Sequence, residues 1–302
     1  MKLQYMKLVF ILIFLIVCYK IYVTYTRRLR KDVFVITYET DTKHKNLKSL
    51  EDTLKANNYR YKVINERKWK GFGGKIKKLK SYLTNLHPEQ IVIITDARDV
   101  LSVNFKNDQL YSFVTKKDIN NRVIVSTEIG CCVPAKFKPG QLRTKDGKVL
   151  NRTFDKKESK DNFDNEWKNM FKKQADKAGI KHPVTHKQSI YLNAGIYCGK
   201  VKNILNIYTL MNIEDKEDDQ LIMSEIFYHH PDKFLFDYNR EIFSNSHVWD
   251  SFNNKKFDDD SGCYYKKDGK IIKDTYLNSK PFFIHTPGKH FKCYDYIFEN
   301  FI

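Results

Sequence analysis

The sequence predicts an α/β fold with a mostly parallel central sheet flanked by helices. Residues 32–40 and 59–65 are β-branched and aromatic runs of strand length, and residues 44–58 between them place leucines on one helical face. A strand, a helix and a strand in that order imply a parallel crossover. A third run, at residues 91–95, is wholly uncharged and ends abruptly in charged residues. The 302-residue chain is 41% hydrophobic, which is enough to bury the core of one large domain.

The amino terminus differs in composition from the rest of the chain. An apolar run from Leu8 to Tyr19 is followed by Lys20, a short second apolar stretch and a basic cluster. A membrane-spanning helix needs about 20 apolar residues, a length that the run reaches if Lys20 extends to an interface. We therefore expect residues 1–31 to form a transmembrane anchor with a basic flank and residues 32–302 to form the folded domain. A cleaved signal peptide is the alternative, but no small-residue cleavage motif follows the run.

The remaining elements follow from hydrophobic periodicity. A glycine-rich loop precedes residues 75–86, where apolar residues recur at helical spacing between lysines. The same reasoning predicts strands over residues 122–128, 191–199 and 281–285, and helices over residues 201–213 and 219–228. Residues 136–165 are polar and charged, and we expect them to form a surface excursion.

The net charge and the cysteines bear on two questions: whether the protein binds nucleic acid, and whether it holds zinc or disulfides. The formal net charge of +18 suggests nucleic acid, because clusters of Lys and Arg neutralise phosphates. The lysines are instead spread along the whole chain, so we predict no nucleic-acid partner. The six cysteines include no C-x-x-C pair and no zinc spacing, and vicinal Cys131 and Cys132 cannot easily bridge each other. The sequence leaves the pairing of the cysteines open.

Two aspartates at the end of a predicted strand are candidate metal ligands. Asp96 and Asp99 follow the strand at residues 91–95, and ligands bind beyond the carboxyl ends of strands in open parallel sheets. Carboxylates hold the hard divalent cations that neutralise a nucleotide diphosphate. His285, at the end of another apolar strand, can add a neutral imidazole as third ligand. The alternatives are a turn-capping role for one aspartate and a purely structural histidine.

Three further positions are candidates for substrate contact. Lys75 opens a helix after two glycines, so its ammonium can face a phosphate, although a solvated basic face is the alternative. Asn193 and Gly195 interrupt an apolar strand, which is typical of a contact with a sugar hydroxyl or of a β-bulge. Asp218 and Asp219 open a helix, where carboxylates either act as general bases or simply favour the helix amino end.

Seven motifs follow one another along the chain. In chain order they are VITYET, GFGGKIKKLKSYL, IVIITDARDVL, VIVSTEIGCCVPAKF, YLNAGIYCGKV, EDDQLIMSEIFY and IHTPGK. This ordered set resembles the glycosyltransferase domain of the procollagen lysyl hydroxylase and collagen glycosyltransferase family, and the resemblance covers the chain from about Asp32 to about Lys292. Each motif is weak alone, and their common order carries the resemblance.

The resemblance implies a GT-A fold, which is Rossmann-like, and a UDP-sugar donor. It implies Mn²⁺ held by Asp96, Asp99 and His285. It also implies a set of donor-binding and catalytic residues: Thr37 and Tyr38 near the uridine, Trp69, Lys75, Asp96, Gly195, Gly288 and Lys289 also at the donor, and Asn193, Asp218 and Asp219 as catalytic residues around the sugar and acceptor.

We therefore predict a Mn²⁺-dependent hexosyltransferase that moves glucose or galactose from a UDP-sugar to a hydroxylysine-like or glycan acceptor. The sequence leaves open whether the anomeric configuration is inverted or retained. The alternative is a catalytically silent accessory protein of the same fold that binds glycans or collagen-like chains, and intact metal ligands argue against it. We expect a single-pass membrane protein with its catalytic domain in the lumen of the endoplasmic reticulum or Golgi. The basic cluster after the apolar run favours the opposite orientation.

Overall fold

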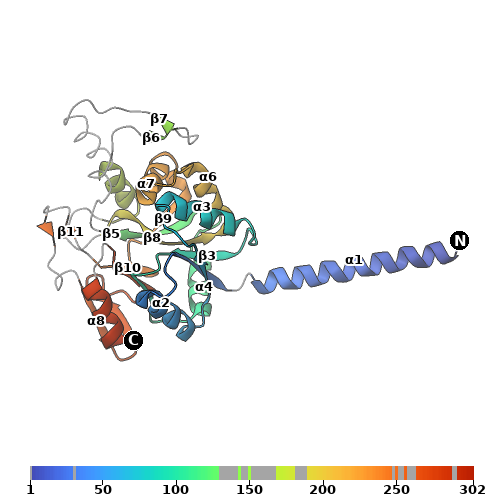
Figure 1. Cartoon of the computed structure of the whole chain (residues 1–302), viewed down its shortest axis with the longest axis horizontal. Helices are drawn as coiled ribbons and strands as arrows, with labels where there is room; N and C mark the ends of the chain where they lie inside the picture. The colour runs from blue at the N-terminus through green and yellow to red at the C-terminus, as the bar shows by residue number, and fades with distance from the viewer. Residues whose placement is uncertain are drawn as a thin grey trace.

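The computed structural model describes residues 2–29, 32–128, 142–143, 149–150, 168–180, 189–246, 249–250, 255–256, 263–287 and 291–302. Most of the surface excursion expected at residues 136–165 lies outside these residues. The chain forms an α/β body from which one long helix extends (Figure 1).

A six-stranded sheet forms the centre of the body, in the order β2-β1-β3-β8-β5-β9. Its strands are β1 (Val33–Glu39), β2 (Arg60–Asn65), β3 (Ile91–Thr95), β5 (Val123–Glu128), β8 (Tyr191–Lys200) and β9 (Phe234–Phe236). Strand β8 runs antiparallel to β3 and β5, while the other five strands share one direction. The predicted α/β fold with a mostly parallel sheet is thus confirmed, and β8 makes the sheet mixed.

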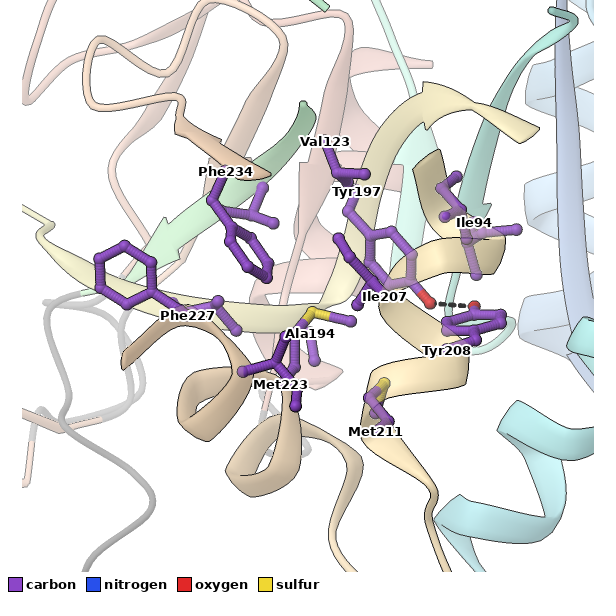
Figure 2. Packing of buried hydrophobic residues seen from close by; sticks show 14 of the residues in the cluster. Ile94, Val123, Ala194, Tyr197, Ile207, Tyr208, Met211, Met223, Phe227 and Phe234 are labelled. Atoms are coloured by element: carbon purple, nitrogen blue, oxygen red, sulfur yellow. Dashed lines mark hydrogen bonds between the residues drawn. The ribbon is translucent and has the colours of Figure 1, made fainter. Parts of the chain in front are cut away.

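Besides the helix over residues 168–177, five helices of the described chain cover the two faces of this sheet (Figure 1). They are α3 (Phe72–Leu83), α6 (Val201–Met211) and α7 (Asp219–His229) on one face, and α2 (Lys45–Ala56) and α4 (Asn107–Thr115) on the other. Because side chains alternate along a strand, Ile36 packs in the cluster of the first three helices and Val35 in that of the other two. Figure 2 shows the first cluster, where the hydroxyls of Tyr197 and Tyr208 form a hydrogen bond.

A second, three-stranded sheet packs beside the first. It consists of β10 (Phe243–Asn245), β15 (Phe283–His285) and β4 (Val100–Ser102), in the order β10-β15-β4. Strand β15 runs parallel to β10 and antiparallel to β4. Phe283 contributes to the same buried cluster as α2 and α4, whereas the neighbouring Ile284 belongs to a third cluster. This sheet therefore joins the central core to an outer layer.

The outer layer contains the carboxyl-terminal helix and a hairpin. Helix α8 (Phe291–Phe301) and strands β13 (Tyr265–Asp268) and β14 (Ile271–Asp274) contribute to the third cluster. A disulfide between Cys263 and Cys293 joins the start of the hairpin to α8. This bond answers the question of pairing, which the sequence left open, for two of the six cysteines.

Short elements complete the described chain. They are the pair β6 (Leu142–Arg143) and β7 (Val149–Leu150), the pair β11 (Trp249–Asp250) and β12 (Lys255–Lys256), the 3-10 helix η2 (Pro231–Lys233) and a helix over residues 168–177.

Helix α1 (Lys2–Leu29) is the long helix that extends from the body (Figure 1). The structure describes its side chains over residues 9–22, and these are exposed. Across the described residues, no helix combines the length and the apolarity that crossing a membrane requires. The helix expected at residues 1–31 is therefore present, but its expected role as a membrane span has no support in the structure.

Candidate active site

Three candidate metal ligands from two sheets meet at one edge of the body. Asp96 directly follows β3, and its backbone N–H donates to Gly195 O over 2.7 Å. Asp99 precedes β4, and His285 ends the adjacent β15, where it pairs with Val100. One ligand atom from each of Asp96, Asp99 and His285 lies within 4.8 Å of the others. We call these three residues the ligand cluster, and the structure brings them together as the sequence predicted.

Gly195 lies against the ligand cluster at a point where no side chain fits. A Cβ on Gly195 would lie 2.2 Å from His285 Cε1 and 3.0 Å from Asp96 Oδ2. The pairing of β5 with β8 also shifts between Val125 and Ser126, so β8 is irregular around Gly195, where a β-bulge was one interpretation of the sequence. The glycine therefore allows β8 to approach the cluster closely.

Two buried atoms of the ligand cluster, Asp99 Oδ1 and His285 Nε2, have no hydrogen-bond partner among the described residues. The His285 side chain is 2% exposed, and its Nε2 lies 3.5 Å from Asp99 Oδ2. Unpaired buried polar atoms are rare and call for an explanation. Two carboxylates and an imidazole with free lone pairs are a donor set that suits a divalent cation such as Mn²⁺.

At both Asp96 and His285, burial and the neighbouring opposite charges shift the pKa in opposite directions. Burial raises the pKa of Asp96, and this effect exceeds the lowering by the nearby ammonium of Lys75. Burial lowers the pKa of His285, but the carboxylates of Asp99 and Asp96 raise it by more, so the net shift is upward. A bound cation would relieve the repulsion between the two carboxylates, which lie close together in a partly buried position.

The first turn of α3 places Lys75 beside the ligand cluster. A Cβ on Gly73 would lie 1.8 Å from Glu214 O, so the glycine lets this turn pack onto the loop before α7. Lys75 is 7% exposed, and its Nζ lies 3.1 Å from Asp96 Oδ1 and 2.6 Å from Asp219 Oδ2. Burial lowers the pKa of Lys75, but the two carboxylates raise it by more. Lys75 is thus a buried cation held between two carboxylates rather than part of a solvated basic face.

Aromatic side chains lie near the end of β1, where the resemblance implied a uridine site. The rings of Tyr38 and Trp69 have centroids 5.9 Å apart, and those of Trp69 and Phe72 lie 5.2 Å apart. Trp69 is 47% exposed, whereas Thr37 is buried and donates its hydroxyl to Thr95 O over 2.8 Å. Tyr38 and Trp69 are therefore in contact, while the Thr37 hydroxyl is engaged within the sheet.

Asn193 belongs to a hydrogen-bonded network that includes two residues missed by sequence reasoning. Its Nδ2 donates to Glu128 Oε2 over 3.1 Å, and Gln220 Nε2 donates to Glu128 Oε1 over 2.7 Å. Asn193 Oδ1 accepts from the N–H of Gly195 over 2.9 Å. Glu128 ends a predicted strand, so the rule that placed Asp96 at the ligand edge could have found it. Gln220 gave no comparable signal.

The two aspartates that open α7 have different surroundings. Asp218 is the N-cap of α7, and its Oδ1 accepts from the N–H of Leu221 over 3.0 Å. Asp219 is 5% exposed and forms the ion pair with Lys75. The helix-end alternative is thus correct for Asp218, whose catalytic role stays a prediction together with that of Asp219. Gly288 and Lys289, also predicted at the donor, lie outside the described residues.

Asn245 also contacts the ligand cluster, and the sequence gave no sign of it. Its Oδ1 lies 3.0 Å from His285 Nδ1, because β10 and β15 pair in register at these two positions. Strand β10 has only three residues, too few for periodicity to predict it.

Comparison with known proteins gives one family match in sequence. A family model described as the PLOD GT domain, a glycosyltransferase (GT) domain, matches residues 144–302, more than half of the chain. The matched span contains His285, Asn193 and the two aspartates of α7, whereas Asp96 and Asp99 precede it. A comparison with curated protein sequences found no match.

The solved structures that are distantly similar to this chain include the following two. One is a glycosyltransferase involved in the glycosylation of the major capsid of PBCV-1, with 9% identity and a TM-score of 0.44, covering 88% of this chain and 98% of that chain. The other is HddC from Yersinia pseudotuberculosis, with 11% identity and a TM-score of 0.26, covering 63% of this chain and 84% of that chain. Neither TM-score is high enough to assign a fold.

Proposed function

Because the chain belongs to the PLOD GT domain family and is therefore a glycosyltransferase, we propose that it transfers glucose or galactose from a UDP-sugar to a hydroxylysine-like or glycan acceptor in a metal-dependent reaction. One observation carries the proposal: Asp96, Asp99 and His285 converge, and two buried ligand atoms among them have no hydrogen-bond partner within the part of the chain that the structure describes. Family membership supports glycosyl transfer in general, and the donor, the metal ion and the acceptor are what we propose.

The ligand cluster would hold Mn²⁺ through two carboxylates and one imidazole. When bound, the cation neutralises the negative charge that develops on UDP as it leaves. With three protein ligands, the ligand cluster would leave further coordination positions of the cation open to diphosphate oxygens. Asp96 also contacts Lys75, so the ligand cluster and the buried ammonium form one connected group of charges.

Lys75 supplies the second positive charge for the diphosphate. Its ion pairs with Asp96 and Asp219 hold the ammonium beside the metal ligands before the donor arrives. A preorganised charge stabilises a developing anion without the cost of reorganising at the moment of reaction. In this proposal Asp219 is a positioning residue for Lys75.

The donor and acceptor groups would occupy opposite sides of the ligand cluster. Exposed Trp69 with Tyr38 is an aromatic surface suited to stacking against uracil, which supports the predicted uridine site. Asn193 and Glu128, linked to each other beside Gly195, offer amide and carboxylate groups to sugar hydroxyls. Asp218, at the start of α7, remains the predicted acceptor-side carboxylate.

Radiolabelled UDP-sugar turnover with Mn²⁺ tests the proposal. The full chain, the Asp99→Ala variant and a control Asp52→Ala variant are compared, since Asp52 is an exposed residue on α2 paired with lysines. We expect Asp99→Ala to lose at least about 100-fold in rate, because removing a mere partner of a metal ligand already costs about 10- to 100-fold. Asp52→Ala should match the wild type. Equal rates for Asp99→Ala and wild type contradict the metal assignment.

The alternative hypothesis, a catalytically silent accessory protein of the same fold, predicts a different result. Its affinity for UDP would not depend on Mn²⁺, whereas the proposed enzyme binds UDP more tightly when Mn²⁺ is present. Calorimetric titration of UDP with and without the cation separates the two.

We also propose that the amino-terminal segment attaches the protein to a membrane and that the catalytic domain is lumenal. The exposed apolar side chains of α1 support attachment, and the Cys263–Cys293 disulfide supports an oxidising compartment. Carbonate extraction of membranes tests the first part. Protease digestion of sealed vesicles tests the second, and cleavage of the domain without detergent contradicts a lumenal location.

A further inference from the structure

The partner of His285 on the side away from the metal ligands is a buried asparagine. Asn245 is fully buried and His285 is 2% exposed. Asn245 Oδ1 lies 3.0 Å from His285 Nδ1, with the two residues paired in register across parallel strands β10 and β15. The backbone reinforces the contact, because the N–H of Ser246 donates to His285 O over 2.8 Å.

A second hydrogen bond of Asn245 determines which end of its amide faces the histidine. Asn245 Nδ2 donates to the backbone oxygen of Thr127 over 2.7 Å. A carbonyl oxygen cannot donate, so the NH₂ group must point to Thr127 and the amide oxygen to His285. The usual ambiguity between the two orientations of an asparagine amide is therefore resolved by chemistry.

The amide oxygen in turn determines the protonation of the imidazole. Asn245 Oδ1 can only accept, so His285 Nδ1 must carry a proton to donate to it. A neutral imidazole has one N–H, which leaves Nε2 with a free lone pair. Nε2 is the atom that lies 3.5 Å from Asp99 Oδ2 and has no hydrogen-bond partner among the described residues.

We infer that Asn245 is a positioning residue that selects the Nδ1–H tautomer of His285 and thereby presents the Nε2 lone pair to a divalent cation beside Asp96 and Asp99. The inference rests on the proposed metal-dependent function and deepens it. Histidine ligands in metal sites generally depend on such a partner for their tautomer and ring orientation.

A buried network of hydrogen bonds and one ion pair holds the backbone of Asn245 in place. The hydroxyl of Tyr264 donates to Asn245 O over 2.5 Å, and Arg240 Nη1 donates to that hydroxyl over 3.2 Å. Arg240 forms a fully buried ion pair with Asp274 at 2.9 Å. The position of Asn245 is thus determined by the outer layer of the protein as well as by its own strand.

Three variants of the full chain distinguish a positioning role of Asn245 from a general contribution of a buried asparagine to the stability of the core. Asn245→Leu removes the acceptor opposite Nδ1, whereas Asn245→Asp keeps one. Asn203→Leu is the matched control: Asn203 is also buried and also donates its amide to backbone oxygens, among them Ile119 O at 2.8 Å, but it lies on α6 away from the ligand cluster.

The first measurement is the tautomer of His285 in metal-free protein, by long-range ¹H–¹⁵N NMR at a pH where the ring is neutral. The wild type and Asn245→Asp should show the Nδ1–H form, and Asn245→Leu should lose it. An Nε2–H form in the wild type overturns the inference even if no variant folds.

The second measurement is Mn²⁺ affinity from electron paramagnetic resonance titration. We expect Asn245→Leu to bind Mn²⁺ about 10- to 100-fold more weakly, Asn245→Asp to recover most of the loss and Asn203→Leu to match the wild type. Wild-type affinity in a folded Asn245→Leu variant overturns the inference but leaves the proposed function standing. A wild type that binds no Mn²⁺ overturns the proposed metal dependence, and this inference with it.

Discussion

Two carboxylates, fully buried Asp274 on β14 and partly buried Asp99 before β4, have opposite surroundings. Asp274 is fully buried and accepts from Arg240 Nη1 at 2.9 Å, Ser244 Oγ at 2.6 Å and the N–H of Tyr276 at 2.8 Å. Asp99 has a buried oxygen without a hydrogen-bond partner among the described residues. The first carboxylate is saturated by the fold, and the second keeps free lone pairs.

This difference separates a structural charge from a functional one. Removal of one partner from a buried ion pair is strongly destabilising, because the other charge is then left buried and uncompensated. A carboxylate at a ligand site costs stability in the empty protein and gains its partner from the ligand. Substitutions at the two positions should therefore affect different properties, and the predictions below follow from this contrast.

The largest effect on stability is expected at Asp274. Asp274→Ala leaves the Arg240 guanidinium buried without its counterion, which should lower the free energy of unfolding by about 3–5 kcal/mol. Chemical denaturation measures the change. The control Asp268→Ala removes a solvent-exposed pair with Lys273 on the same hairpin and should lower the free energy of unfolding far less than Asp274→Ala does. Similar losses for both variants contradict the assignment of Asp274 as a structural charge.

At Asp99 we expect the reverse of Asp274: a large loss of transfer activity with little loss of stability. Asp99→Asn has nearly the same shape but removes a ligand charge, so Mn²⁺-dependent transfer should fall by at least about 100-fold. The free energy of unfolding of the metal-free protein should fall by less than about 0.5 kcal/mol or rise, because the repulsion between Asp99 and Asp96 is relieved. A loss of stability as large as that expected for Asp274→Ala would make Asp99 a structural residue as well.

A smaller effect is expected at Gly195. The Cβ of Gly195→Ala would press on His285 and Asp96, and such overpacking costs about 1–3 kcal/mol. Mn²⁺ affinity should fall with stability. Gly199→Ala on the same strand is the control, since its Cβ would meet Val123 Cγ2 at 3.1 Å, outside the ligand cluster. Calorimetry and metal titration on both variants check this, and unchanged Mn²⁺ affinity in Gly195→Ala would contradict the close approach.

The smallest expected effect is a pH-dependent loss of stability when the charge of Glu39 is removed. Burial raises the pKa of Glu39, but hydrogen bonds from Arg98 and from the N–H groups of Asp41 and Thr40 lower it by more, so the net pKa lies below its usual value of 4.5. A lowered pKa stabilises the fold above the unfolded-state pKa, and this contribution is lost as the pH falls through the folded-state pKa.

Glu39→Gln should therefore cost roughly 1 kcal/mol near neutral pH, a modest value because Arg98 is 42% exposed. The difference between variant and wild type should disappear as the pH falls below the pKa of the folded protein. Thermal melts across this range measure it. A difference that stays constant with pH would show that the Glu39 charge is not involved.

Local patterns were sufficient to predict the crossover β1–α2–β2, the strand before Asp96 and the helix that starts near Lys75. Each depends on side chains close together in the chain, and the apolar periodicity of those segments is strong. The strand-end rule predicted that Asp96 and Asp99 lie together beyond the end of β3, which the structure confirms, and the same rule would have selected Glu128 at the end of β5.

What the sequence by itself determined is the α/β class and the kind of chemistry, because apolar periodicity and the residue types at strand ends are local properties. The motifs named His285 as a third ligand, but only the tertiary structure shows how His285 meets Asp96 and Asp99, that Lys75 is held between two carboxylates and that Asn245 contacts the imidazole. These contacts join residues from distant segments of the chain, and they depend on strand register. A one-residue slip would turn each side chain of a strand to the opposite face and so destroy the contacts.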